Sequence, residues 1–223
     1  MRLIAHRGFA AEHPENTRSA VEKAAAMADA IEIDVRRCAS GELVVIHDET
    51  VDRVTDGEGR VADLSLLELR QLDVLGTGEG VPTLSEVLRA IPNTVGVNAE
   101  LKESGTAEDA LALLKSLHPQ TVVSSFSREI LAECREADPS VPRALITDEE
   151  GTDSVEVAID LDCGYVHPAV DVCTGRLVTE SHRAGMSVNA WTVETRSEAE
   201  ELNDIGVDGI IADRPNVRPE ISP

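Results

Sequence analysis

Charged side chains end several short apolar runs of this chain, and their types could act on a phosphate ester. In chain order they are His6, Arg7, Glu32, Asp34, His47, Glu100 and Lys102. One apolar residue separates the members of each Glu-x-Asp or Glu-x-Lys pair, and strand residues two apart project from the same face. Each pair therefore directs two charges to one side, where buried charges must be paired or bound to a metal.

Glu32, Asp34 and Glu100 are the candidate metal ligands. A set of oxygen ligands suits Mg²⁺ or Ca²⁺, with Mn²⁺ also compatible, better than zinc. Such a cation polarises a phosphoryl oxygen and neutralises developing charge. The alternative is a solvated face or an ion pair, which is less compatible with the central position expected for the strand of Glu32 and Asp34.

His6 and His47 are the candidate general acid and base, because imidazole suits both roles near neutral pH. Chain order does not decide which histidine has which role. Arg7 and Lys102 are the candidate phosphate-binding residues, arginine as a planar fork and lysine as a point charge. The alternative for Lys102 is an ion pair with Glu100 or Glu103.

Phe126 and Trp191 are predicted to form an apolar wall for the alcohol part of a substrate. Core packing is the competing interpretation, chiefly for Phe126. His167 also ends an apolar run, which makes it a weaker substrate-contact candidate. The remaining histidines lack charged neighbours of this kind and are expected to be structural; they are His13, His118 and His182.

Eight apolar runs alternate with helical patterns, which is typical of βα units and a parallel sheet. The predicted strands are Arg2–His6, Ala30–Val35, Val95–Lys102, Thr121–Phe126, Arg143–Thr147, Gly164–His167, Ser187–Val193 and Asp208–Asp213. Helices are predicted to begin near Asn16, Thr83, Thr106, Arg128, Thr152, Cys173 and Thr195. The pattern favours a TIM (β/α)8 barrel, whose active residues follow the carboxyl ends of strands. An open, doubly wound sheet is the alternative, although no G-x-G-x-x-G follows the first strand.

A ninth apolar run, Glu42–His47, interrupts this alternation. It begins too soon after Val35 for a parallel crossover, so we expect an antiparallel hairpin. With Ser40-Gly41 as a two-residue turn, Asp34 would lie opposite His47. Residues 36–81 are then a hairpin and small insertion at the barrel mouth, within a single catalytic domain spanning residues 1–223.

The net charge of −22 indicates an acidic protein that repels nucleic acid and anionic membranes. Adaptation to high salt is the preferred explanation, with an ordinary acidic protein as the alternative. The four cysteines show no paired spacing, and no apolar stretch approaches the ~20 residues of a membrane span. We therefore expect a cytoplasmic enzyme with reduced thiols and no membrane insertion; its oligomeric state stays open, a homodimer included.

The motifs, in order, resemble those of glycerophosphodiester phosphodiesterases. They are H-R-G, P-E-N-T, I-E-I-D-V, V-V-I-H-D, V-P-T-L-S-E-V-L, N-A-E-L-K, S-S-F, W-T-V and G-V-D-G-I-I-A-D-R-P. The similarity runs from His6 to Pro215, and it is the ordered combination that is specific.

This resemblance implies a TIM barrel with a small insertion after the second strand and a divalent cation held by Glu32, Asp34 and Glu100. It implies the roles given above for the two histidines, Arg7 and Lys102, and a supporting role for Asn16. The expected reaction converts small glycerophosphodiesters to an alcohol and glycerol phosphate. A lysophospholipase D or phospholipase-type phosphodiesterase is the alternative, and a non-catalytic barrel that binds phosphorylated ligands is a third.

Overall fold

The computed structural model describes residues 1–151 and 153–218, which form a nine-stranded sheet surrounded by helices. The strands are β1 (Arg2–Ala5), β2 (Ala30–Arg37), β3 (Leu43–Val45), β4 (Gly96–Leu101), β5 (Thr121–Ser125), β6 (Arg143–Thr147), β7 (Tyr165–Pro168), β8 (Ser187–Val193) and β9 (Gly209–Ala212). The α-helices are α1 (Arg18–Ala24), α2 (Leu66–Leu69), α3 (Leu84–Ala90), α4 (Ala107–Leu117), α5 (Arg128–Ala137), α6 (Asp153–Asp160), α7 (Gly175–Arg183) and α8 (Arg196–Asp204). Short 3-10 helices are η1 (His6–Gly8), η2 (Val61–Asp63), η3 (Val170–Val172) and η4 (Pro215–Val217).

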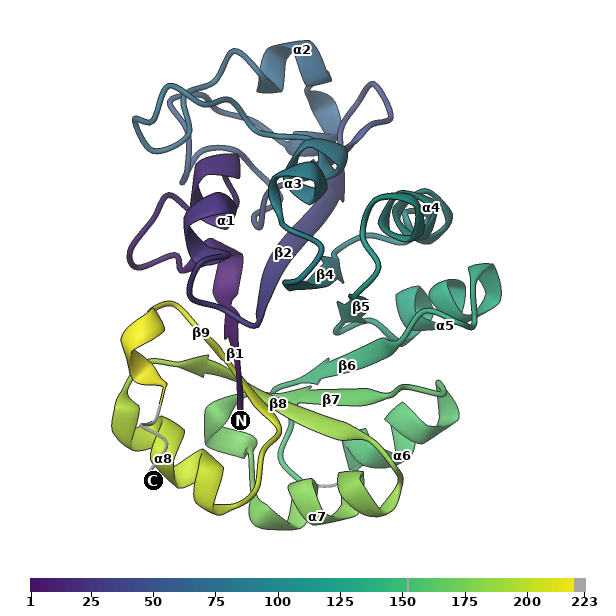
Figure 1. Ribbon diagram of the computed structural model, residues 1–223. Coiled ribbons are helices and arrows are strands. Elements are labelled where there is room, and N and C mark those ends of the chain that lie inside the picture. The colour runs from purple at the N-terminus through teal and green to yellow at the C-terminus, as the bar shows by residue number, and fades with distance from the viewer. Residues whose placement is uncertain (152, 219–223) are drawn as a thin grey trace.

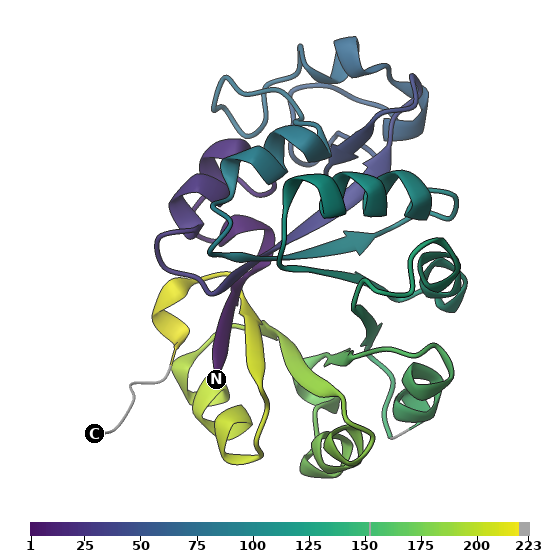
Figure 2. The ribbon, with the colours of Figure 1, turned by 45° about the vertical axis from the view of Figure 1, so that its right-hand side comes forward.

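Eight of these strands close into a parallel barrel. β1 pairs with β2 on one side and with β9 on the other, so the first strand joins the two ends of the sheet. The helices lie outside this ring (Figures 1 and 2). The predicted TIM barrel is confirmed, and the open-sheet alternative is wrong.

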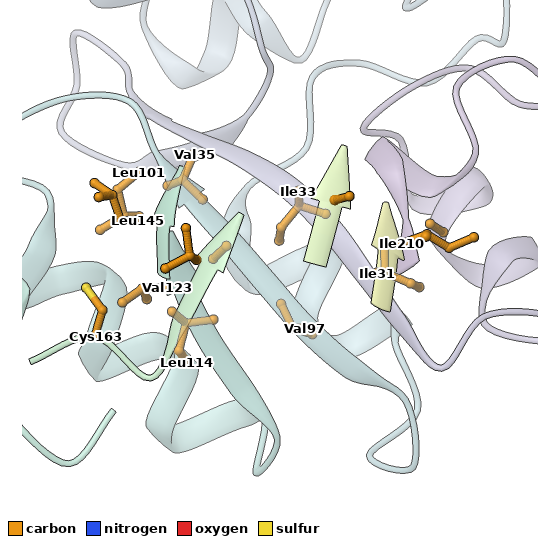
Figure 3. Close-up of a cluster of buried hydrophobic side chains, with 14 of the residues drawn as sticks. Ile31, Ile33, Val35, Val97, Leu101, Leu114, Val123, Leu145, Cys163 and Ile210 are labelled. Carbon is orange, nitrogen blue, oxygen red and sulfur yellow. The ribbon is translucent and has the colours of Figure 1, made fainter. Parts of the chain in front are cut away.

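Because side chains alternate along a strand, β2 and β4 place successive residues in two environments, the hydrophobic cluster and the barrel interior. Ile31, Ile33 and Val35 of β2 belong to the main hydrophobic cluster, in which Leu114 of α4 also lies. Figure 3 shows these side chains among the other members of the cluster. The intervening residues, Glu32 among them, must face the barrel interior.

The antiparallel strand β3 extends the barrel sheet beyond β2, as the sequence predicted, but in a different register. Val35 pairs with Val45 and Arg37 with Leu43, so a three-residue loop, 39–41, replaces the predicted two-residue turn. A type I′ turn needs positive φ at both central residues, whereas only Gly41 (φ 101°) takes it here. The backbone of Asp34 therefore accepts a hydrogen bond from Ile46 N–H, and the predicted pairing of Asp34 with His47 is wrong.

Residues 38–81, which we call the insertion, have a hydrophobic cluster of their own. It contains Val51, Val54, Val61 and Leu69, all buried, and it is separate from the main cluster. The insertion lies beyond the end of β2 (Figure 1). The insertion therefore packs around a hydrophobic cluster of its own, which can support side chains that face the barrel mouth.

Helix starts follow the predicted capping chemistry where it was most specific. Thr83 caps α3, its hydroxyl accepting from Glu86 N–H while the Glu86 carboxylate accepts from Thr83 N–H. The helix start predicted near Thr152 lies outside the described residues. Within residues 1–151 and 153–218, every helix is too short or too polar to cross a bilayer.

Candidate active site

Three carboxylates from adjacent strands meet inside the barrel. Asp34 of β2 is in register with Glu100 of β4, and Glu32 lies two residues before Asp34 on the same face. One oxygen from each residue lies within 4.8 Å of the others. We call Glu32, Asp34 and Glu100 the carboxylate cluster; their predicted proximity is confirmed.

The carboxylate cluster is suited to a hard cation. All three residues are buried, and Glu32 Oε1 has no hydrogen-bond partner among the described residues. Burial, reinforced by the charge of Asp34, raises the pKa of Glu32. Burial also opposes ionisation of Asp34, but Lys102 and Arg7 hold the pKa of that carboxyl below its ordinary value. An additional cation would compensate the Glu32 oxygen, so the residues present fit a divalent metal ion.

Arg7 and Lys102 contact this cluster directly. Arg7 Nε lies 3.2 Å from Asp34 Oδ2, and Arg7 Nη1 donates to Glu15 Oε1. Lys102 Nζ lies 2.9 Å from Asp34 Oδ1 and also pairs with Glu100. The predicted alternative of a Lys102–Glu100 ion pair is therefore present, and Glu103 pairs instead with Arg36.

The turn after β1 holds Arg7 in an uncommon backbone conformation. Arg7, Gly8 and Phe9 have φ values of 50°, 80° and 66°. A Cβ at Gly8 would lie 2.9 Å from the Ala20 Cβ of α1, so both backbone angle and space require glycine. This conformation lets Arg7 N–H donate to Glu32 Oε2 at 3.0 Å, which ties the turn to the carboxylate cluster.

Each candidate acid–base histidine is oriented by an aspartate. His6 Nδ1 lies 2.7 Å from Asp213 Oδ1, and His47 Nδ1 lies 2.6 Å from Asp48 Oδ1. Because an ionised carboxylate only accepts, each Nδ1 carries the proton. The other ring nitrogen of His6, Nε2, lies 4.0 Å from Glu32 Oε2.

The surroundings shift the pKa values of the two imidazoles in opposite directions. Burial opposes protonation of His6, but Asp213 and Glu32 outweigh it and raise its pKa. For His47, burial outweighs Asp34 and Asp48, and its pKa is lowered. The surroundings therefore separate the pKa values of the two imidazoles, as they do in the acid and base of many active sites.

A pocket of about 240 Å³ opens at the carboxyl ends of the strands. It is lined by every predicted site residue except Asp34, which is fully buried behind it. Phe126 and Trp191 meet edge to face, with ring centroids 5.5 Å apart. Phe126 is 45% exposed, so its side chain lies at the pocket and the core-packing alternative is wrong. We call this cavity the mouth pocket.

His167 lines the mouth pocket as well, although it is almost completely buried. Asn189 Nδ2 lies 2.9 Å from its Nε2, which must therefore accept, and Trp191 Nε1 donates to its carbonyl oxygen. Burial lowers the pKa of His167 to about 3, which keeps this imidazole neutral.

Several side chains that complete the site had no role predicted from the sequence. Glu15, Asp48 and Asp213 hold Arg7, His47 and His6 respectively. Asp213 was recognisable only as the end of the last strand, since 207 residues separate it from His6. Asn98 lies two residues before Glu100 on the inward face of β4 and lines the mouth pocket, a position that the strand period could have indicated.

Asn16 is an example of a supporting residue that the sequence did indicate. Its amide Nδ2 donates to Asp34 Oδ2 at 2.8 Å, and its Oδ1 accepts from Asp34 N–H. Its φ of 60° places it in the left-handed region that asparagine tolerates. These bonds fix the orientation of the most buried carboxylate in the cluster.

Known proteins are similar to this chain in both sequence and fold. Residues 6–217 match the model of the glycerophosphoryl diester phosphodiesterase family. The chain is 35% identical to a glycerophosphodiester phosphodiesterase of Caldanaerobacter subterraneus, over 96% of this chain and 94% of that protein. It is similar to a solved phosphodiesterase of Oleispira antarctica in complex with the product sn-glycerol-3-phosphate, with a TM-score of 0.89, 31% identity and coverage of 96% and 94%.

A glycerophosphodiester phosphodiesterase structure from Agrobacterium tumefaciens gives the same result. Its TM-score is 0.86 at 28% identity, with coverage of 97% of this chain and 98% of that one. The agreement of the family match, the full-length relatives and the barrel shows that this chain belongs to the glycerophosphoryl diester phosphodiesterase family and is an enzyme of the phosphoric diester hydrolase class.

Proposed function

We propose that this enzyme hydrolyses small glycerophosphodiesters to an alcohol and glycerol phosphate, using a divalent cation and two histidines. The observation that carries the proposal is the meeting of the carboxylate cluster with His6 and His47 at one pocket. The product sn-glycerol-3-phosphate in the Oleispira antarctica relative supports the glycerol phosphate part of this substrate.

In the proposed reaction, an oxygen nucleophile attacks phosphorus and the bond from phosphorus to the alcohol oxygen breaks. One histidine removes the proton of the nucleophile, and the other gives a proton to the departing alkoxide. The nucleophile is water or a neighbouring substrate hydroxyl, which would give a cyclic phosphate that water then opens. Arg7 and Lys102 bind phosphate oxygens and stabilise their developing charge.

Glu32, Asp34 and Glu100 would hold Mg²⁺ or Ca²⁺, with Mn²⁺ also compatible. A cation bound there would supply Lewis acidity toward a phosphoryl oxygen. The protein contributes the fixed positions of its ligands, which come from two strands in register and are restrained by Asn16 and the turn after β1. Residues 1–223 act in this proposal as one catalytic domain.

The size of the mouth pocket favours a small alcohol over a lipid. About 240 Å³ is below the ~300–1,000 Å³ of typical ligand pockets, and its aromatic wall consists of two rings. Phe126 and Trp191 would contact the alcohol part. This argues for glycerophosphodiesters ahead of the lysophospholipase D alternative.

The proposal is tested with a substrate panel. Purified enzyme is given glycerophosphocholine, glycerophosphoethanolamine, glycerophosphoglycerol and lysophosphatidylcholine, each with Mg²⁺, Ca²⁺ or EDTA. We expect release of glycerol phosphate from the first three in a manner that requires the cation. Preferred cleavage of lysophosphatidylcholine would instead support the lipid alternative, and turnover in EDTA would remove the metal from the proposal.

A further inference from the structure

Arg53 of the insertion connects two carboxylates that come from different parts of the chain. Its Nε and Nη2 donate to Asp48 at 2.6 and 3.1 Å, and its Nη1 and Nη2 donate to Glu15, both at 2.8 Å. Glu15 precedes α1, whereas Asp48 follows β3. One planar guanidinium therefore holds both groups in a bidentate manner, which a lysine could not reproduce.

Each of these carboxylates in turn holds a side chain of the candidate active site. Asp48 Oδ1 accepts from His47 Nδ1 at 2.6 Å, and Glu15 Oε1 accepts from Arg7 Nη1 at 3.0 Å. The contacts form a continuous series from His47 through Asp48, Arg53 and Glu15 to Arg7. Arg53 touches neither the mouth pocket nor the carboxylate cluster, so its influence on them would be indirect.

The backbone of Arg53 is anchored on both sides in the hydrophobic cluster of the insertion. Val51 and Val54 are buried there, and Thr55 N–H donates to the carbonyl of Val51. The packing of the insertion thus fixes the backbone from which the Arg53 side chain extends. Its side chain is nevertheless 49% exposed, and ion pairs of that exposure contribute little to stability.

We infer that Arg53 is a positioning residue, through which the packed insertion fixes the orientations of His47 and Arg7 relative to each other. The inference rests on the proposed function, in which His47 transfers a proton and Arg7 binds the phosphate. Losing Arg53 frees Asp48 and Glu15 to rotate, and each takes its active-site partner out of alignment. Through Arg53, the insertion thus helps to orient two residues of the candidate active site.

The test compares Arg53→Ala with Arg60→Ala. Arg60 belongs to the same insertion, is similarly exposed, and pairs with the single carboxylate of Glu49, so it is a matched control. We expect Arg53→Ala to lower kcat by about 10–100-fold, the usual effect of a small misplacement of reacting groups. KM should change much less, the midpoint of thermal unfolding should stay close to that of the natural protein, and Arg60→Ala should keep full activity.

Two further measurements separate positioning from a structural role. Arg53→Lys should stay impaired, because an ammonium cannot hold both carboxylates in a bidentate manner. Guanidinium ion added at low concentration should restore part of the activity of Arg53→Ala and none of that of Asp48→Asn. A loss of activity that only follows a loss of folded protein would overturn the inference.

The same experiments separate this inference from the proposed function. His47→Asn is assayed in parallel with Arg53→Ala. If His47→Asn is inactive while Arg53→Ala has the kcat of the natural protein, the positioning role is wrong and the proposed function stands. If His47→Asn is fully active, the proposed function fails, and the positioning role fails with it.

Discussion

Asp34 Oδ1 and Lys102 Nζ lie 2.9 Å apart. Each side chain also contacts a second group of opposite charge: Asp34 contacts Arg7, and Lys102 contacts Glu100. Burial opposes the charge on Lys102, but Asp34 and Glu100 outweigh it and raise the pKa of the ammonium. Lys102 therefore compensates two members of the carboxylate cluster and leaves Glu32 Oε1 without a partner among the described residues. This unequal compensation of the three acids supports the proposed metal site.

Substitution of Glu100 by Ala should abolish turnover that depends on a divalent cation while leaving the fold intact. The substitution removes one of three oxygen ligands, so isothermal titration should show weaker binding of Mg²⁺ or Ca²⁺. Glu49→Gln, an exposed carboxylate paired with Arg60, is the control. Undiminished activity of Glu100→Ala would remove the metal assignment.

The two histidines should respond differently to the leaving group of the substrate. Asparagine at either His6 or His47 should lower the rate with glycerophosphocholine by about 10²–10⁴-fold, the scale of general acid–base catalysis. A p-nitrophenyl ester of glycerol phosphate needs no proton on its leaving group. The variant whose activity recovers with that ester identifies the acid; equal losses with both substrates for both variants would contradict this division of roles.

His167 should make the folded protein sensitive to acid. Its pKa is about 3 in the folded state because of burial, against about 6.5 in an unfolded chain. Between these values the unfolded state binds a proton that the folded state does not, so the free energy of unfolding falls as the pH falls. Near pH 4.5 the loss should be about 2–3 kcal/mol.

Chemical denaturation of His167→Gln at neutral and acidic pH measures this contribution. Glutamine keeps a carbonyl that can accept from Asn189 but does not titrate, so the variant should lose less stability on acidification than the natural protein does. His182→Gln, at an exposed histidine, serves as the control. An unchanged pH dependence in His167→Gln would show that the buried imidazole is not responsible.

Salt should stabilise this acidic chain. At a net charge of −22, the excess carboxylates of the folded chain repel one another. Raising the ionic strength from about 0.1 M to about 1 M shortens the screening length from ~10 to ~3 Å and so weakens this repulsion. The midpoint of thermal unfolding should therefore rise over this range of NaCl concentration. Sucrose at matched osmolality controls for general solvent effects, and a midpoint that does not respond to NaCl would argue for an ordinary acidic protein.

The sequence predicted most of the barrel because local patterns determined it. The alternation in β2 and β4 separated Ile31 and Ile33 from Glu32 and Asp34, and the Thr83–Glu86 capping box marked a helix start. The hairpin register was missed because it depended on the backbone angle of Ser40, which a dipeptide motif does not determine.

Long-range partners could not be predicted in this way. Asp213 reaches His6 across 207 residues, and Arg53 reaches Glu15 across 38, so neither contact has a local sequence signal. Only the closure of the barrel and the packing of the insertion place these groups. The reactive residues themselves were recognisable from strand ends, whereas the side chains that orient them were not.

The position of β1 between β2 and β9 has a consequence for the synthesis of this enzyme. The carboxylate cluster and His47 are all present once the first hundred or so residues have been made, but Asp213, which orients His6, follows the last strand. The hydrogen bond between His6 and Asp213 can therefore form only after almost all of the described chain has been made. Pairing of β9 with β1 is thus the step that both closes the barrel and brings the partner of His6 into place.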